Sequence, residues 1–154
     1  MELKEIVRLI KGRLLYESES LLEREYSYAV ASDLMSNVML DTADDSVLIT
    51  SLVNPQVIRA SEMMNITCII ITCGKTVTEP MIELAKNRNI ALVETRDTTF
   101  TVCGKLHGLG LREGPLSFEP GQVTSITLEK DRCIGCIHCV RNCPTEAIRI
   151  RNWK

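Results

Sequence analysis

Apolar residues recur every three or four positions over the first fifteen residues, with charged residues between them. This spacing predicts an amphipathic helix over residues 1–15. The next apolar run, Tyr28–Ala31, has the length of a strand, and Ser32 or Asp33 is expected to cap a helix behind it. The apolar residues of the first helix are Leu3, Ile6, Val7, Ile10 and Leu14, and those of the second are Leu34, Met35, Val38 and Met39.

A second pattern then occurs three times: an apolar run of strand length, a polar turn and an amphipathic helix. The runs are Val47–Thr50, Thr67–Thr72 and Ile90–Glu94. Asn54 and Pro55 mark the first of these helix starts, because Asn is a favoured N-cap and Pro a favoured first helical residue. The second helix contains Met81, Ile82 and Ala85, and the third follows Thr98 with Phe100, Cys103 and Leu106 on one face.

Alternating strands and helices with nearly continuous apolar strands are typical of a parallel sheet covered by helices. The sequence therefore predicts an α/β domain over residues 1–111. Residues 112–124 are rich in Gly and Pro and show no periodicity, which indicates a linker. A small C-terminal half-domain of the ferredoxin type is expected over residues 125–154, with short strands at Ile126–Leu128 and Ile148–Arg151.

Composition narrows the classes of function. The 154 residues are 45% hydrophobic and 25% charged, and a net charge of −2 provides no basic surface for nucleic acid. No apolar run approaches the roughly 20 residues of a membrane span, and the first five residues lack the layout of a signal peptide. We therefore expect a cytoplasmic protein that binds neither nucleic acid nor a membrane.

Four of the seven cysteines form one motif: Cys133, Cys136, Cys139 and Cys143, followed by Pro144. Two-residue gaps allow three successive thiolates to surround one face of a [4Fe–4S] cube, as in bacterial ferredoxins. Zinc sites usually pair two Cys-x-x-Cys hooks across a longer loop, and an odd number of cysteines suits a disulfide framework poorly. The predicted cofactor is a [4Fe–4S] cluster, with zinc and disulfides as the alternatives.

The role of the fourth cysteine leaves the number of clusters open. In two-cluster ferredoxins the cysteine at the position of Cys143 ligates the other cluster, and this chain contains no second motif. Either the chain is a fragment of a longer protein, or Cys143 completes a single cube, or another cysteine or a second subunit supplies the missing ligand. Of the upstream cysteines, Cys68 and Cys103 are expected in the core, whereas Cys73 ends a strand.

Polar residues follow the predicted strands at the edge where open α/β sheets bind ligands, next to helix N-termini. Candidate ligand residues there are Ser51, Asn54, Thr72 and Gly74, and a third strand ends at Glu94–Asp97. Neither a Gly-x-Gly-x-x-Gly motif nor a phosphate-loop motif is present. The domain is therefore either a nucleotide sensor or a scaffold that mediates dimerisation.

Four strings in residues 1–111 resemble the DRTGG domain: Leu21–Glu25, Ala31–Met35, Asn54–Ala60 and Glu83–Lys86. This domain occurs in regulatory parts of phosphotransacetylases, in pyrophosphatases beside CBS domains, and in small proteins associated with iron-only hydrogenases. Residues 131–148 resemble bacterial two-cluster ferredoxins and the N-terminal cluster segment of proteins related to iron-only hydrogenases. The two resemblances imply a regulatory or adaptor domain and a hydrogenase-type redox partner.

Two functions follow from these features. The leading hypothesis is an iron–sulfur protein that passes electrons to or from a redox partner. The alternative is a regulatory module whose α/β domain binds a nucleotide or protein partner, or forms a homodimer, while the cluster senses redox state or holds structure. The sequence shows neither the paired carboxylates nor the Cys–His constellation that would indicate an independent catalytic site.

Overall fold

The computed structural model describes residues 1–38 and 43–114. The chain divides into two units, Met1–Glu119 and Pro120–Lys154, and all described residues belong to the first. In chain order the described elements are α1 (Leu3–Leu9), β1 (Arg13–Tyr16), α2 (Glu19–Leu22), β2 (Tyr28–Ala31), α3 (Met35–Val38), β3 (Ser46–Thr50), α4 (Pro55–Met63), β4 (Cys68–Ile71), α5 (Glu79–Asn87), β5 (Ala91–Glu94), α6 (Thr99–Gly108) and β6 (Arg112–Glu113).

The strands form one sheet in the order β1-β5-β4-β3-β2-β6. Strands β2 to β5 run parallel, and β6 is parallel to β2. Strand β1 pairs antiparallel with β5 and forms one edge of the sheet. The predicted α/β sheet is therefore confirmed, with an antiparallel edge strand that the sequence pattern did not indicate.

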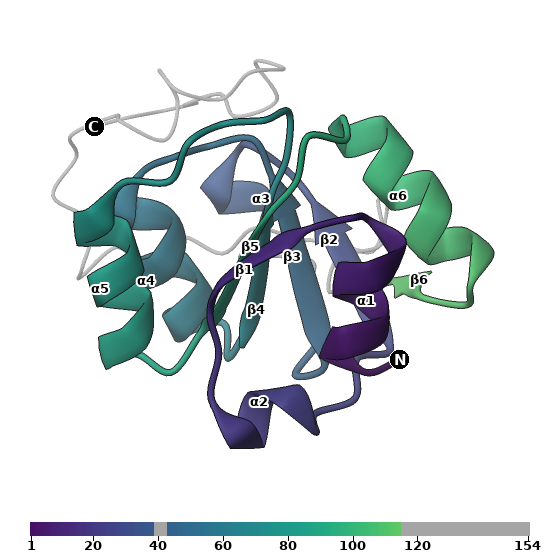
Figure 1. The fold of residues 1–154 in the computed structure, drawn as a ribbon, viewed down its shortest axis with the longest axis horizontal. Coiled ribbons are helices and arrows are strands. Elements are labelled where there is room, and N and C mark those ends of the chain that lie inside the picture. The colour runs from purple at the N-terminus through teal and green to yellow at the C-terminus, as the bar shows by residue number, and fades with distance from the viewer. Residues whose placement is uncertain (39–42, 115–154) are drawn as a thin grey trace, which may run out of the picture. The chain divides into compact units, whose positions relative to one another are not determined.

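Helices cover both faces of the sheet, which lies between them in Figure 1. Helices α1 and α6 pack on one face around a core that includes Ile6, Ile49 and Val93. Helices α4 and α5 pack on the other face, around a core that includes Leu48 and Met81. Successive β3 residues thus enter opposite cores, which is why this strand is apolar along its whole length.

The helix predicted over residues 1–15 is wrong in its second half. Helix α1 ends at Leu9, Lys11 adopts a left-handed φ of 49°, and β1 begins at Arg13. A Cβ atom at Gly12 would lie 2.7 Å from Cγ1 of Val93, so this turn runs against β5 where only glycine fits. Leu14 keeps the helical spacing from Ile10 but pairs with Val93 as a strand residue.

Two smaller predictions also differ from the structure. Phe100 is predicted on the buried face of its helix, but it is 88% exposed, and α6 buries Val102 together with the expected Leu106. Phe100 precedes Val102 by two residues, or roughly 200° around a helix, so the two side chains point in opposite directions. Arg112 and Glu113, at the start of the predicted linker, form β6 beside β2. From residue 115 on, the predicted linker and the predicted half-domain with its cysteine motif lie outside the described residues.

Candidate functional site

The helices that follow β4 and β5 lie on opposite faces of the sheet. Helix α5 follows β4 and contacts α4, whereas α6 follows β5 and contacts α1 (Figure 1). The chain therefore leaves the carboxyl ends of two neighbouring parallel strands in opposite directions. In open α/β sheets this topological switch point is where a crevice forms and ligands bind.

A cavity of about 470 Å³ lies at this switch point, within the size range of small-molecule sites. Three segments line it: the turn between α1 and β1, the loop after β4, and the end of β5 with its following loop. The lining residues are Ile10, Lys11 and Arg13 from the first segment, Gly74, Lys75 and Thr76 from the second, and Glu94, Thr95, Arg96 and Asp97 from the third.

Backbone hydrogen bonds hold the two loops of this cavity together. The Cys73 amide donates to the Asp97 carbonyl at 2.8 Å, and the Gly74 amide donates to the Thr95 carbonyl at 2.9 Å. Cys73 and Gly74 both adopt φ near 64°, the left-handed conformation that lets the loop turn back toward β5. The Thr95 hydroxyl donates to the Ile10 carbonyl at 2.7 Å. The α1–β1 turn is thereby fixed to the same rim.

Positively charged side chains outnumber carboxylates in the lining of the cavity. Arg13 donates to Glu94 from Nε at 2.8 Å and from a terminal guanidinium nitrogen at 2.7 Å, and Lys105 bonds Asp97 at 2.6 Å. Both carboxylates that line the cavity are therefore paired. Within residues 1–38 and 43–114, the three other cations of the lining have no carboxylate partner, and all are exposed: Lys11, Lys75 and Arg96.

The structure places the four candidate ligand residues on the predicted edge of the sheet, but only Gly74 lines the cavity. Thr72 is fully buried, and its hydroxyl lies 2.7 Å from that of Thr99. Asn54 caps α4 by accepting a hydrogen bond from the Gln56 amide at 2.9 Å. A ligand role for these residues stays a prediction.

The fourth candidate, Ser51, belongs to a hydrogen-bond network around Asp33. The Ser51 hydroxyl and amide each donate to the Asp33 carboxylate at 2.7 Å, as does the Thr50 hydroxyl. These bonds, led by that from the Ser51 amide, lower the pKa of the Asp33 carboxyl below its ordinary value. The network joins the carboxyl ends of β2 and β3 and makes Asp33 a structural anion.

The sequence pattern identified part of the cavity but missed one wall. Arg96 lies in the strand end Glu94–Asp97 at the expected ligand edge, and Lys75 follows the candidate residue Gly74. The helix predicted over residues 1–15 includes Lys11 and Arg13, whereas the structure places both in the cavity lining and Arg13 in a strand paired with β5. Gly12 between them was the available signal, because glycine is unfavourable inside a helix.

The upstream cysteines differ in exposure. Cys68 is fully buried, as predicted, and burial raises the pKa of its thiol to about 12. Cys103 is partly buried against the α1–α6 core, and burial raises its pKa too. Cys73 is exposed at the rim of the switch point, where hydrogen bonds from the Thr72 side chain and the Thr99 backbone lower the pKa of its thiol.

No group of three or more His, Cys, Asp or Glu residues suited to a metal ion occurs in the part of the chain that the structure describes. The motif cysteines Cys133, Cys136, Cys139 and Cys143 lie outside that part. Their role as cluster ligands therefore stays a prediction.

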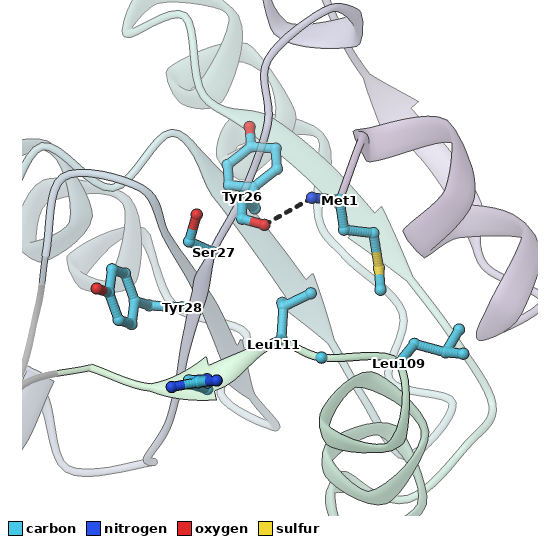
Figure 2. Close-up of a pocket in the computed structure, with 8 residues that line it drawn as sticks. Met1, Tyr26, Ser27, Tyr28, Leu109 and Leu111 are labelled. Atoms are coloured by element: carbon cyan, nitrogen blue, oxygen red, sulfur yellow. Dashed lines mark hydrogen bonds between the residues drawn. The ribbon is translucent and has the colours of Figure 1, made fainter.

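A second cavity, of about 340 Å³, lies beside the start of β2 and the approach to β6. Figure 2 shows Tyr26, Leu109 and Leu111 around it, with the terminal ammonium of Met1 donating to the Tyr26 carbonyl at 2.8 Å. Among described residues, Arg112 is the one charged side chain of its lining. This cavity therefore lacks the cluster of charged side chains found at the switch point.

The fold and the cavity define a doubly wound α/β domain with a basic crevice at its switch point. The chain belongs to the DRTGG domain family, whose model matches residues 5–109. The predicted family assignment of this domain is therefore confirmed. No curated protein matches the chain.

A solved structure shares the fold: the CBS and DRTGG domains of the regulatory region of Clostridium perfringens pyrophosphatase, complexed with the activator diadenosine tetraphosphate. The identity is 17% and the TM-score is 0.59, and the match covers 84% of this chain and 56% of that one. This chain thus corresponds to little more than half of the regulatory region.

The described residues contain no helix of the length and apolarity that crossing a membrane requires.

Proposed function

We propose that this chain is a regulatory module whose DRTGG domain binds a nucleotide in the switch-point cavity. The cavity carries the proposal, because it has the size of a small-molecule site and lies where α/β sheets bind ligands. The fold match to a regulatory region solved with diadenosine tetraphosphate supports a nucleotide as the ligand. This function corresponds to the alternative hypothesis from the sequence.

Calorimetry and thermal unfolding of the full chain with ATP, ADP, GTP and diadenosine tetraphosphate test this proposal. We expect saturable binding of at least one nucleotide, with a melting temperature that rises with ligand concentration. Thr76→Trp should block binding by filling the cavity without changing its charge. Gln56→Trp, at an exposed position on α4, is the matched control and should bind normally. Absence of binding by all four nucleotides would refute the proposal.

We further propose that Cys133, Cys136, Cys139 and Cys143 hold a [4Fe–4S] cluster. Thiolates are the preferred ligands of such clusters, and the spacing is that of bacterial ferredoxins. Anaerobic reconstitution should give a brown protein with about four irons per chain, and Cys136→Ser should lose them. Retention of bound zinc instead of iron would contradict the assignment.

The cysteine spacing favours a second candidate function, electron transfer to a redox partner such as a hydrogenase-type enzyme. The two functions predict different responses to nucleotide. A regulatory module should change its oligomeric state or cluster reduction potential when nucleotide binds. An electron carrier should be reduced and reoxidised by its partner at the same rate with and without nucleotide.

A further inference from the structure

The cations of the switch-point cavity come from three separate segments. Lys11 lies in the α1–β1 turn, Lys75 in the loop after β4 and Arg96 in the loop after β5. The loop hydrogen bonds described above fix these segments relative to one another. Three positively charged residues on fixed segments therefore line one cavity, and none of them pairs with a described carboxylate.

Arg96 is also positioned by its own packing. Its Cγ atom lies 3.9 Å from the place where a Gly74 side chain would begin, so the aliphatic stem lies over the glycine. Glycine at this position serves the left-handed turn, whereas a Cβ there would make only ordinary van der Waals contact with Arg96. The guanidinium of arginine presents a planar set of donors that matches phosphate oxygens, and the two lysines add point charges.

We propose that Lys11, Lys75 and Arg96 form a polyphosphate subsite that binds at least two linked phosphate groups of the nucleotide. One phosphate monoester carries a charge of about −2, which is less than the three positive charges of the subsite. The charge of a diphosphate or a longer chain matches them better. This inference rests on the proposed function and specifies which part of the nucleotide enters the cavity. Arg13 stays paired with Glu94 and holds β1 against β5.

The experiment measures dissociation constants of the full chain for adenosine, AMP, ADP, ATP and inorganic tripolyphosphate. We expect ADP, ATP and tripolyphosphate to bind, AMP to bind at least about tenfold more weakly, and adenosine not to bind. Raising the salt concentration should weaken ADP binding, because the cations are exposed.

Variants locate the subsite. Lys75→Gln and Arg96→Gln should each weaken ADP binding by about tenfold or more, and the double variant should weaken it further. Lys86→Gln, which removes one exposed positive charge from α5, is the control and should leave affinity within about twofold. The three substituted residues, Lys75, Arg96 and Lys86, are exposed, so the variants should fold. Thermal unfolding without ligand checks this, and the melting temperature should not change.

Four other outcomes would contradict either the polyphosphate subsite, the proposed nucleotide binding, or both. Adenosine that binds as tightly as ADP would leave the nucleotide proposal standing and refute the polyphosphate subsite. AMP that binds as tightly as ADP would refute the requirement for two phosphates. Tripolyphosphate that binds while every nucleotide fails would retain the anion subsite and refute the proposed function. Failure of all probes would refute both.

Discussion

The hydroxyl oxygens of Thr72 and Thr99 lie 2.7 Å apart and join the end of β4 to the first turn of α6. The Thr72 hydroxyl is also 3.3 Å from the Thr50 carbonyl, so one buried side chain connects two neighbouring strands and a helix. The contact thus joins the residue just before one loop of the cavity to the residues just after the other.

Thr72→Val removes this hydroxyl while keeping the branched shape. We expect the free energy of unfolding to fall by about 1 kcal/mol, because a buried hydrogen bond is lost and the Thr99 hydroxyl loses its partner. Urea denaturation at pH 7 measures the change. Thr101→Val removes a hydroxyl from the exposed pair with Thr98 and should cost less than about 0.5 kcal/mol. Equal losses in the two variants would contradict a special role for the Thr72 contact.

Gly12 and Gly104 should respond oppositely to alanine. Gly12→Ala places a Cβ 2.7 Å from Val93 Cγ1 and should lower the free energy of unfolding by roughly 1–3 kcal/mol. Gly104 lies inside α6 with no heavy atom within 4 Å of a Cβ, so Gly104→Ala should raise it by about 0.5–1 kcal/mol. Thermal unfolding of the two variants tests the pair. A stabilising Gly12→Ala would show that the α1–β1 turn has room for a Cβ beside Val93.

Asp33→Asn should destabilise the domain at neutral pH, by roughly 1 kcal/mol after allowance for its solvent exposure. The folded state lowers the pKa of Asp33, so its contribution is complete above the unfolded value of 3.8 and disappears as pH falls through the lowered folded pKa. The difference between wild type and variant should therefore shrink on acidification, starting near pH 4.

Urea denaturation at pH 7, 5 and 3 measures that difference. Asp44→Asn is the control, because among the described residues the Asp44 carboxylate makes no hydrogen bond or ion pair. A difference for Asp33→Asn that is constant across the three pH values would show that its carboxylate contributes through packing and not through charge.

Among the upstream cysteines, Cys73 should react with iodoacetamide first. Its thiol is exposed and has a lowered pKa, whereas Cys68 is buried with a raised pKa. The thiolate is the reacting form, so Cys73 should be modified much faster at pH 7. Peptide mass spectrometry of the full chain assigns the modified sites. Thr72→Val should slow the reaction of Cys73, since it removes a hydrogen bond that lowers this pKa, whereas Thr101→Val should not.

Local signals predicted much of the fold correctly. The apolar runs at β3, β4 and β5 and the helix start at Asn54 and Pro55 are encoded by neighbouring residues, and the structure confirms them. The helix expected after Thr98 is confirmed too, and the Thr98 hydroxyl caps it by accepting from the Thr101 amide. Such features depend on contacts within a few residues, which a single sequence displays directly.

The cavity was only partly predictable because its walls meet through distant contacts. Arg13 and Glu94 are 81 positions apart, and no local pattern indicates that they pair. Helical spacing from Ile10 to Leu14 concealed β1, so the lysine and arginine beside it were not recognised as cavity residues. The strand ends allowed the ligand edge of the sheet to be predicted. The positive charge of the cavity could not be predicted in full, because Lys11 and Arg13 reach it only through the pairing of β1 with β5.

The pairing of β1 with β5 also sets the order in which this domain can assemble. During synthesis, the residues of β1 emerge long before Glu94, so they have no strand to join until β5 has formed. Closing so long a loop is slow compared with forming the local β–α units. The switch-point cavity is therefore completed late, and the proposed ligand would stabilise only chains in which the N-terminal strand has taken its place.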